Sequence, residues 1–399
     1  MTRAPRFAAR ILKTFVAPVL LAGALAGVTP IGAAASTSWT EVPIPSAGSS
    51  DNSLEGVAAL SPTNAWAVGT YRAGSGATQD SLILHWNGSH WTKKSSPNPG
   101  GTGRTMLFGV AATSSTDVWA VGYYHHNGSR FHTLVLHWNG TSWTHMSSPN
   151  PGTTNNLLTG VAAISSHNAW AVGYHYTGTG GFSTLILHWD GVSWKRVTSP
   201  SPGDSTFYNI LNGVAAVSST NVWAVGAHNE GTAYTTLVLH WKGTSWKRVP
   251  SPNPGSASPT FDNYLSGVSA TSSTNVWAVG FYEDGTATQA LVLRWKGTSW
   301  AQTSTPHTGP SSDGNFLNGV SATSSTNAWA VGYYFNGTVK RTLILHWNGT
   351  SWTHQTSPNP GGSSLDNVLQ GVAATSSTDA WAVGSYVDIA NQNIALRCC

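Results

Sequence analysis

The sequence predicts an all-β protein, a seven-bladed β-propeller built from four-stranded antiparallel blades. The first observation is a repeat: GVAATSSTDVWAVG, which begins at Gly109, recurs with small changes at Gly56, Gly160, Gly213, Gly267, Gly319 and Gly371. These marker glycines are 51 to 54 residues apart, and a tryptophan lies ten positions after each. The second is composition: 43 Gly, 20 Pro and 20 Trp with 9% charged residues exclude a disordered chain, a coiled coil and a helix bundle with a charged surface.

Each repeat contains four expected strands. In the second copy they run from Leu107 to about Ala112, from Val118 to Tyr124, from Thr133 to Trp138 and from Ser142 to about Ser147. Four strands in a period of this length are typical of a propeller blade.

The third and fourth strands are predicted to form a tight hairpin. Asn139-Gly140 is the dipeptide favoured in a two-residue type I′ turn. Such a turn would pair Trp138 with Thr141 and Leu136 with Trp143, so that both tryptophans and Leu136 share one sheet face. Both faces must then be buried between neighbouring blades.

The two ends of the chain are predicted to complete one blade together. The seventh copy ends with residues 394–398, where a third strand is expected, and it lacks a fourth. Residues 36–45 match a fourth strand with no preceding three. Three tryptophans per blade would make 21, and the missing one falls at Cys398. We therefore expect residues 36–45 to close the ring, which removes unpaired sheet edges.

Residues 1–35 are predicted to be a signal peptide, and residues 36–399 a single propeller domain. A basic segment precedes an apolar stretch from Phe15 to Val28 and small residues that end at Ala35. The apolar stretch is interrupted by Pro18 and is short for a membrane anchor. We therefore expect a secreted, extracellular protein with no stable membrane anchor after cleavage.

Charge argues against a nucleic-acid partner. Four of the 19 basic residues lie in the predicted signal peptide, which leaves 15 against 15 acidic residues. A neutral chain lacks the clustered Lys and Arg that phosphate binding needs.

The two rims of the predicted ring differ. The turns between strands one and two and between strands three and four are nearly constant, reading SSTN or SSTD and NGTS or KGTS. The other two connections vary in length and content. Loops on a rigid frame commonly carry function, so the variable rim is the expected binding face.

Two residue types recur on that rim and are the candidate ligand-binding residues. An asparagine stands four residues before six marker glycines, as Asn52, Asn156, Asn209, Asn263, Asn315 and Asn367. A tyrosine or histidine stands two residues after each WAVG, as Tyr71, Tyr124, His175, His228, Tyr282, Tyr334 and Tyr386. We expect the two sets to be approximate cross-strand neighbours.

Amide and aromatic groups together suit sugars, because the amide bonds hydroxyls and the ring packs on a C–H face. The alternative is that each ring is buried between blades and bonds the asparagine, and repetition in every blade favours it.

Five His-Trp pairs, at His85, His137, His188, His240 and His346, suggest a metal site at first sight. Each histidine belongs to the third strand of a different blade, too far from the others to share an ion. We expect structural histidines that bond within their own blades, and no cofactor.

These motifs resemble the repeats of secreted bacterial β-propeller proteins, close to neuraminidase-type Asp-box repeats and to photosystem assembly-factor-like propellers. The resemblance covers residues 36–399. The hairpins read HWNGTSW or, at Asp190, HWDGVSW, so that Trp138 and its equivalents stand where the box has aspartate. A sialidase-like relative would imply three convergent arginines and a tyrosine nucleophile. Arg72, Arg104, Arg130 and Tyr124 are available, but their spacing does not require convergence.

The sequence thus predicts a secreted, non-catalytic binding propeller, expected to be a monomer, that recognises an extracellular or cell-envelope glycan through the variable rim. One alternative is a protein–protein interaction scaffold that uses the same rim. Another is a glycan-processing enzyme, sialidase-like or another glycoside hydrolase.

Overall fold

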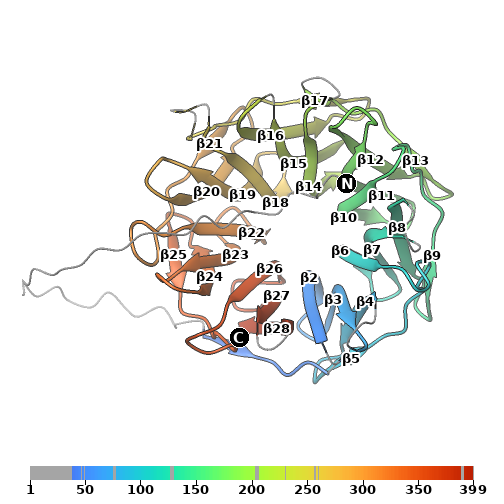
Figure 1. Ribbon diagram of the computed structural model, residues 1–399, viewed down its shortest axis with the longest axis horizontal. Helices are drawn as coiled ribbons and strands as arrows, with labels where there is room; N and C mark the ends of the chain where they lie inside the picture. Colours follow the sequence, from blue (N-terminus) through green and yellow to red (C-terminus); the bar gives the residue numbers. More distant parts are fainter. Residues whose placement is uncertain are drawn as a thin grey trace, which may run out of the picture. The chain divides into compact units, whose positions relative to one another are not determined.

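Seven four-stranded antiparallel sheets make up the computed structural model. It describes residues 38–398 except 46, 49, 75–77, 126–129, 203–205, 230, 256–257, 259 and 388–390. The predicted signal peptide lies outside the described residues. Among the described residues no helix is long and apolar enough to span a membrane. The sheets stand side by side around one axis, with the first strand of each blade innermost (Figure 1).

The blades follow one another in chain order. Blades 1 to 3 contain β2 (Ser50–Ser61), β3 (Asn64–Arg72), β4 (Gln79–Trp86), β5 (Trp91–Lys93), β6 (Thr105–Ser114), β7 (Asp117–Tyr124), β8 (His132–Trp138), β9 (Trp143–His145), β10 (Asn156–Ser165), β11 (Asn168–Tyr176), β12 (Phe182–Trp189) and β13 (Trp194–Arg196). Blades 4 to 6 contain β14 (Asn209–Ser218), β15 (Asn221–Asn229), β16 (Tyr234–Trp241), β17 (Trp246–Arg248), β18 (Asn263–Ser272), β19 (Asn275–Glu283), β20 (Thr288–Trp295), β21 (Trp300–Gln302), β22 (Asn315–Ala322), β23 (Ala328–Phe335), β24 (Lys340–Trp347) and β25 (Trp352–Gln355).

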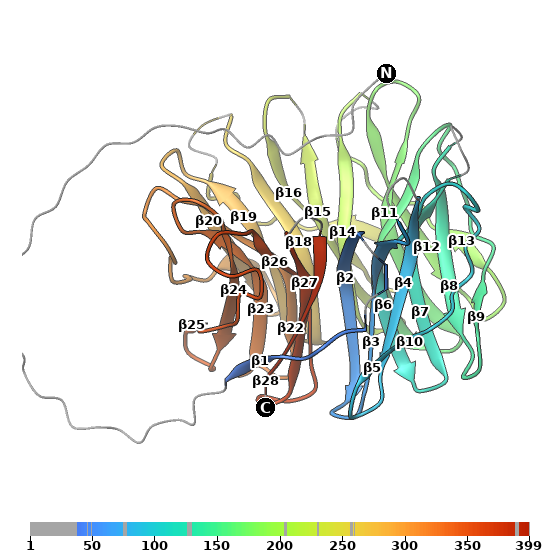
Figure 2. The ribbon, with the colours of Figure 1, turned by 60° about the horizontal axis from the view of Figure 1, so that its bottom comes forward.

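Blade 7 is shared between the two ends of the chain, as the sequence predicts. It combines β26 (Asn367–Ala374), β27 (Ala380–Val387) and β28 (Asn391–Cys398) with β1 (Trp39–Glu41). β1 pairs antiparallel with β28, with Trp39 opposite Cys398. Figures 1 and 2 show β1 along the outer edge of this blade. The predicted closure is confirmed, although the paired part is only three residues long.

The core lies between successive blades. Trp223 and Val225 on one face of blade 4 pack against Leu291 and Trp300 of blade 5. The rings of Trp223 and Trp300 meet edge to face, with centroids 5.4 Å apart, a preferred aromatic geometry. The same arrangement recurs between blades 7 and 1, where Trp381 packs on Leu54. The ring is therefore closed by packing as well as by strand pairing.

The hairpin between strands three and four differs from the predicted turn. Trp138 pairs with Trp143, so the loop has four residues. The Oδ1 atom of Asn139 accepts hydrogen bonds from the backbone N–H groups of Thr141 and Ser142, both at 3.0 Å. Only Gly140 has a positive φ, of 95°, whereas a type I′ turn needs two such residues. The prediction of a type I′ turn was wrong because the asparagine side chain caps the loop.

The marker glycines form a ring around the axis. A Cβ atom on Gly109 would lie 3.1 Å from the Cα atom of Gly160, and one on Gly371 would lie 3.2 Å from that of Gly56. The other marker glycines repeat this contact with the next blade at 3.3–3.5 Å. The innermost strands thus approach one another backbone to backbone, which any side chain would obstruct.

Candidate binding site on the loop rim

The connections divide between the two rims as predicted from the antiparallel order. The turn rim carries the short turns between strands one and two and between strands three and four. The loop rim carries the connections between strands two and three, such as residues 177–181, and the connectors from each fourth strand to the next blade, such as residues 249–262. Figure 2 shows the longer loops together at one end of the ring.

The candidate asparagines and their tyrosine or histidine partners are directly opposite each other in five blades. The pairs are Asn156 with His175, Asn209 with His228, Asn263 with Tyr282, Asn315 with Tyr334 and Asn367 with Tyr386. In blade 2 Thr105 faces Tyr124. In blade 1 a register shift and the positive φ of Asp51 displace Asn52 from the position opposite Tyr71. The predicted cross-strand proximity is therefore correct for six blades.

The asparagine side chains face the connectors. All six are at most 2% exposed. The Oδ1 atom of Asn156 accepts the N–H of Gly152 at 2.7 Å, and its Nδ2 atom donates to the carbonyl of Phe131 at 3.2 Å. Asn263 and Asn367 likewise accept from Gly255 and Gly361, both at 2.9 Å. This geometry favours the packing role, in which each amide fastens a connector to its blade.

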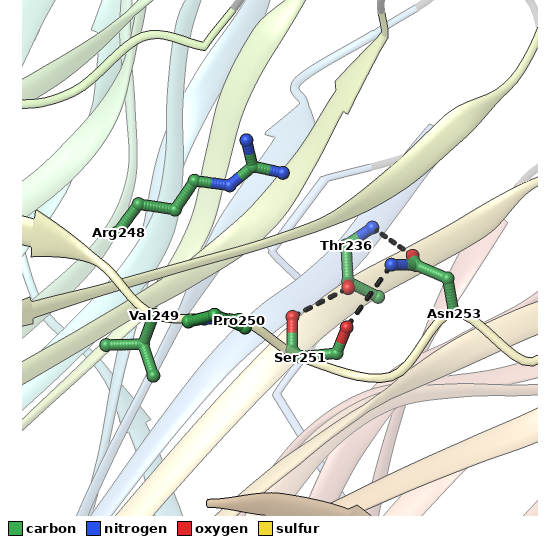
Figure 3. Close-up of a pocket in the computed structure, with 6 residues that line it drawn as sticks. All are labelled: Thr236, Arg248, Val249, Pro250, Ser251 and Asn253. Atoms are coloured by element: carbon green, nitrogen blue, oxygen red, sulfur yellow. Dashed lines mark hydrogen bonds between the residues drawn. The ribbon is translucent and has the colours of Figure 1, made fainter.

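In four blades the connector begins with the same short sequence, a feature that the sequence analysis missed. In blade 4 the Oδ1 atom of Asn253 accepts the N–H of Thr236 at 2.7 Å, and the Thr236 and Ser251 hydroxyls are 2.7 Å apart (Figure 3). Thr133 and Thr342 make equivalent bonds. The signal was present as Ser-Pro-Asn-Pro, which follows the fourth strand in four blades. The connections are thus constant near the strand and variable beyond it.

The tyrosine and histidine set is buried or half-buried between blades and contacts the fourth strand. The Lys93 Nζ atom lies 3.5 Å from the centroid of the Tyr71 ring. The ring of Tyr124 meets that of His145 edge to face, with centroids 5.6 Å apart. The ring of Tyr334 meets that of His354 at 6.2 Å. This position therefore joins the loop-rim ends of strands within one blade.

In blades 3 and 4 the same position holds a histidine and an arginine. The Nη2 atom of Arg196 donates to His175 Nε2 at 3.2 Å, and that of Arg248 donates to His228 Nε2 at 2.7 Å. Burial lowers the pKa of His175, and the charge of Arg196 lowers it further. A neutral histidine can accept this bond.

A second group of aromatic residues, also missed from sequence, lies at the loop-rim ends of the strands in blades 2 to 6. Neighbouring ring centroids within its groups are 4.7–6.3 Å apart. We call these residues the aromatic belt: Tyr123, Phe131, Tyr174, Phe182, Tyr208, Tyr234, Tyr264, Phe281, Phe316, Tyr333 and Phe335. Only part of it repeats, immediately after WAVG, and the remaining rings come from neighbouring strands and connectors. No single repeat position therefore reveals it.

The phenol groups of the belt influence one another. Burial, and secondarily the neighbouring hydroxyls of Tyr123 and Tyr234, raise the pKa of Tyr174 to about 12. Burial also raises the pKa of Tyr264. The hydrogen bond that its hydroxyl donates to Asn212 Oδ1, at 3.4 Å, lowers this pKa by a smaller amount. These phenols stay neutral at ordinary pH and can both donate and accept hydrogen bonds.

The belt is interrupted at blades 7 and 1, where the equivalent positions are not aromatic and include Ser53, Thr70 and Ser385. The Ser53 hydroxyl donates to Glu55 Oε1 at 2.6 Å and lies 3.5 Å from that of Ser385. Burial raises the pKa of Glu55, and the Ser53 bond lowers it by a smaller amount. The loop rim thus carries aromatic groups on blades 2 to 6 and, where blades 7 and 1 meet, a carboxyl with two hydroxyls.

The third-strand histidines bond within their own blades, which confirms the structural interpretation. His240 Nε2 lies 2.8 Å from Asn221 Oδ1, and its ring stacks on Trp223 with centroids 3.7 Å apart. In blade 5 Arg294 takes the same place, bonding Asn275 at 3.1 Å above the Trp277 ring. The described residues contain no cluster of three or more His, Cys, Asp or Glu that could hold a metal ion.

The residues considered for catalysis already have partners or lie apart. Arg72 pairs with Asp51 at 3.4 Å, and Arg104 contacts the Tyr123 hydroxyl, whose pKa it lowers against the larger effect of burial. Arg130 is exposed in the loop of blade 2. Burial raises the pKa of Glu283. Glu230 and Asp388, acidic residues between the second and third strands of blades 4 and 7, lie outside the described residues.

Comparison with known proteins identifies the fold. No family model and no curated protein matches the sequence. Among solved structures, YCF48 bound to D1 peptide has a TM-score of 0.53 at 12% identity, covering 90% of this chain and 96% of that one. The GH74 xyloglucanase from Xanthomonas campestris has a TM-score of 0.53 at 14% identity, covering 88% of this chain and 53% of its own.

A PL25 ulvan lyase bound to -[GlcA(1-4)Rha3S]- has a TM-score of 0.52 at 9% identity, covering 87% and 94% of the two chains. This chain spans about half the length of the xyloglucanase. It shares its fold with propellers of the photosystem assembly-factor type, which its repeats resemble. At these identities the likeness concerns the fold alone.

Proposed function

We propose that this protein is a secreted, non-catalytic binding propeller that recognises an extracellular or cell-envelope glycan through its loop rim. The observation that carries the proposal is the aromatic belt on blades 2 to 6, which is interrupted by the polar group of Glu55, Ser53 and Ser385. An amphipathic surface of this kind matches a sugar, which has apolar C–H faces and hydroxyl edges.

The frame beneath the belt is suited to binding. Connectors are fastened to the strands by the buried asparagines and by the Ser-Pro-Asn-Pro segments. Side chains held on such a frame lose little conformational entropy when a ligand binds, and this increases affinity. Tyr124 and Tyr334, half-buried on the same rim, remain our proposed contacts at its outer part.

The structural neighbours support ligand binding by this fold at the level of analogy. One neighbour is bound to an oligosaccharide containing GlcA and Rha3S, and another is a xyloglucanase. A neighbour of nearly the same length is bound to a peptide, so a protein-binding role on the same rim is the second candidate. A non-catalytic role is favoured over a sialidase-like enzyme because Arg72 and Arg104 are engaged with Asp51 and Tyr123.

A glycan array probed with the purified protein tests the proposal. We expect saccharide binding that falls at least about tenfold in the double variant Tyr333→Ala/Phe335→Ala, since each stacked ring contributes about 1 kcal/mol. Val192→Ala is the control, because Val192 is an 83% exposed apolar residue on the turn rim. Absence of saccharide binding, with recovery of a peptide ligand, would favour the second candidate. Hydrolysis of glycosides by the wild-type protein would contradict the non-catalytic role.

A further inference from the structure

The His–Arg pairs of blades 3 and 4 differ from the equivalent position in every other blade. In these two blades a histidine is the last but one residue of the second strand, and an arginine from the fourth strand reaches it. Elsewhere a tyrosine stands at the first position, with Lys93, His145, Gln302, His354 or Glu41 at the second. The two residues therefore change together, as a unit.

Each arginine is held in place by a buried histidine. His228 is 3% exposed and His175 is 8% exposed. His228 Nε2 also lies 2.9 Å from the Thr235 hydroxyl. The arginines themselves are exposed, and no carboxylate among the described residues pairs with either, whereas the adjacent Lys195 pairs with Asp190 at 2.6 Å. Each guanidinium is therefore an exposed positive charge on a side chain that a histidine anchors.

Arg248 borders a hollow of about 330 Å³ on the loop rim. Its other lining residues are Thr236, Val249, Pro250, Ser251 and Asn253. Figure 3 shows that Thr236, Ser251 and Asn253 bond to one another and that Arg248 lies apart from this group. The unused donors that border the hollow thus belong to Arg248. In blade 3 Thr184, Ser199 and Ser201 make the equivalent hydrogen-bonded group below Arg196.

We propose that Arg248 with His228, and Arg196 with His175, form two anion subsites for the carboxylate or sulfate groups of an acidic polysaccharide. Guanidinium groups bind such oxyanions bidentately. The two subsites are equivalent and lie one blade apart, so a polymer with regularly spaced charges can occupy both and gain avidity. This proposal rests on the proposed glycan-binding function and names the class of glycan.

Titrations with polygalacturonate and dextran sulfate, against neutral dextran, test it. We expect the acidic polymers to bind more tightly, and Arg248→Gln or Arg196→Gln to weaken them roughly ten- to hundredfold. The double variant should approach the affinity for neutral dextran. Lys247→Gln is the matched control, since it removes the same charge from the adjacent, oppositely facing position of β17 and should change the affinity less than about twofold.

The positioning role of the histidine has a separate readout. His228→Phe leaves the Arg248 charge and removes the acceptor that orients it. We expect weaker binding with an unchanged salt dependence, whereas Arg248→Gln should reduce both affinity and salt dependence.

Three results would overturn the proposal. Equal losses in Lys247→Gln and Arg248→Gln would indicate diffuse electrostatic attraction. Equally tight binding of poly-glutamate would show that the anion subsites do not select a polysaccharide. Glycan binding that is indifferent to both arginines would refute the subsites and leave the proposed function intact, whereas failure of every glycan, neutral or acidic, would refute the proposed function itself.

Discussion

The glycine of each WAVG motif has no room for a side chain. A Cβ atom on Gly226 would lie 2.0 Å from the carbonyl oxygen of Ile210 on the neighbouring strand, and the six equivalent glycines show the same approach at 1.9–2.0 Å. This crowding occurs beside the register shift between Leu211 and Gly213. The glycine is therefore a requirement of the irregular ladder of each blade.

We expect Gly226→Ala to lower the free energy of unfolding by more than about 3 kcal/mol, because the backbone of β14 must move to admit the methyl group. Gly74→Ala is the control, since nothing lies within 4 Å of the added atom, and it should change stability by less than about 0.5 kcal/mol. Urea denaturation of the two variants measures the difference. Equal stability of both would contradict the steric explanation.

The buried His240 makes stability depend on pH. Burial, and secondarily Lys242, lower its pKa from 6.5 to about 4. Between these values the unfolded chain binds a proton that the folded chain does not, so stability is full above about pH 6.5 and falls on acidification toward pH 4. His85, His188 and His346, whose pKa values burial also lowers, add to this loss.

We expect His240→Arg to reduce the fall in Tm between pH 7 and pH 5, because an arginine keeps its charge throughout this range. Blade 5 shows that the site accepts one, as Arg294 bonds Asn275 over the Trp277 ring. Thermal unfolding at both pH values measures the change. An unchanged difference in Tm would show that other groups cause the acid sensitivity.

The sequence predicted residue positions correctly where the contacts lie within one blade and therefore repeat in every copy. The marker glycines and the WAVG tryptophans recur in register, and repetition also predicts that the third-strand histidines bond within their own blades. The aromatic belt was not predictable, because Phe281 of blade 5 meets Phe316 of blade 6 and neither lies at a position that is aromatic in every repeat. The His228–Arg248 bond joins two residues that the sequence separates by 20 positions.

Among the elements, β1 has only three residues, yet it completes the last blade. Trp39 is 4% exposed, and its ring meets that of Trp329 of blade 6 edge to face at 5.2 Å. It also packs beside Cys398 in the same cluster. One tryptophan therefore joins the start of the propeller to its last two blades.

We expect Trp39→Ala to lower stability by roughly 3–5 kcal/mol, the usual cost of removing a buried tryptophan. The loss of protection against amide hydrogen exchange should concentrate in β28 and its neighbour β27, because β1 pairs with the outer edge of β28. Hydrogen exchange measured by mass spectrometry locates it. Blades 3 and 4 serve as the internal reference, and equal deprotection there would contradict a local closing role.

Strand order, register between strands one and two, and closure were all predictable at this scale, since they follow from repeat spacing and alternation. The turn after the third strand was not. Asn139-Gly140 suits a type I′ turn, but the asparagine oxygen instead accepts two backbone N–H groups. Side-chain capping and a two-residue turn use the same dipeptide, and the residues that follow decide between them.

Over the whole molecule, the marker glycines bring the innermost strands of neighbouring blades into backbone contact. Each marker glycine meets the next at its backbone, and Gly371 meets Gly56. Because these contacts leave no room for a side chain, we expect them to limit how far the angle between neighbouring blades can change. The sequence predicts seven repeats, whereas this backbone contact becomes evident only in the folded ring.

We expect deletion of one complete repeat, residues 213–266, to abolish cooperative folding. Six blades of this curvature cannot bring the last marker glycine to the first. The ring would then stay open, and the faces of its two terminal blades would be exposed to solvent. Differential scanning calorimetry measures the unfolding transition. A single cooperative transition near the wild-type Tm would show that the blades adapt their angles and that the glycine contacts do not set the number.

The pairing of β1 with β28 also delays closure of the ring during synthesis. Thr40 can pair only after Arg397 has been synthesised, 357 residues further along the chain. At about 5–20 residues per second, the ribosome needs roughly 20–70 s to deliver that partner. Throughout this interval the nascent chain carries completed blades with one tryptophan-rich face bare at each end, a state that a chaperone would have to shield until the final strand emerges.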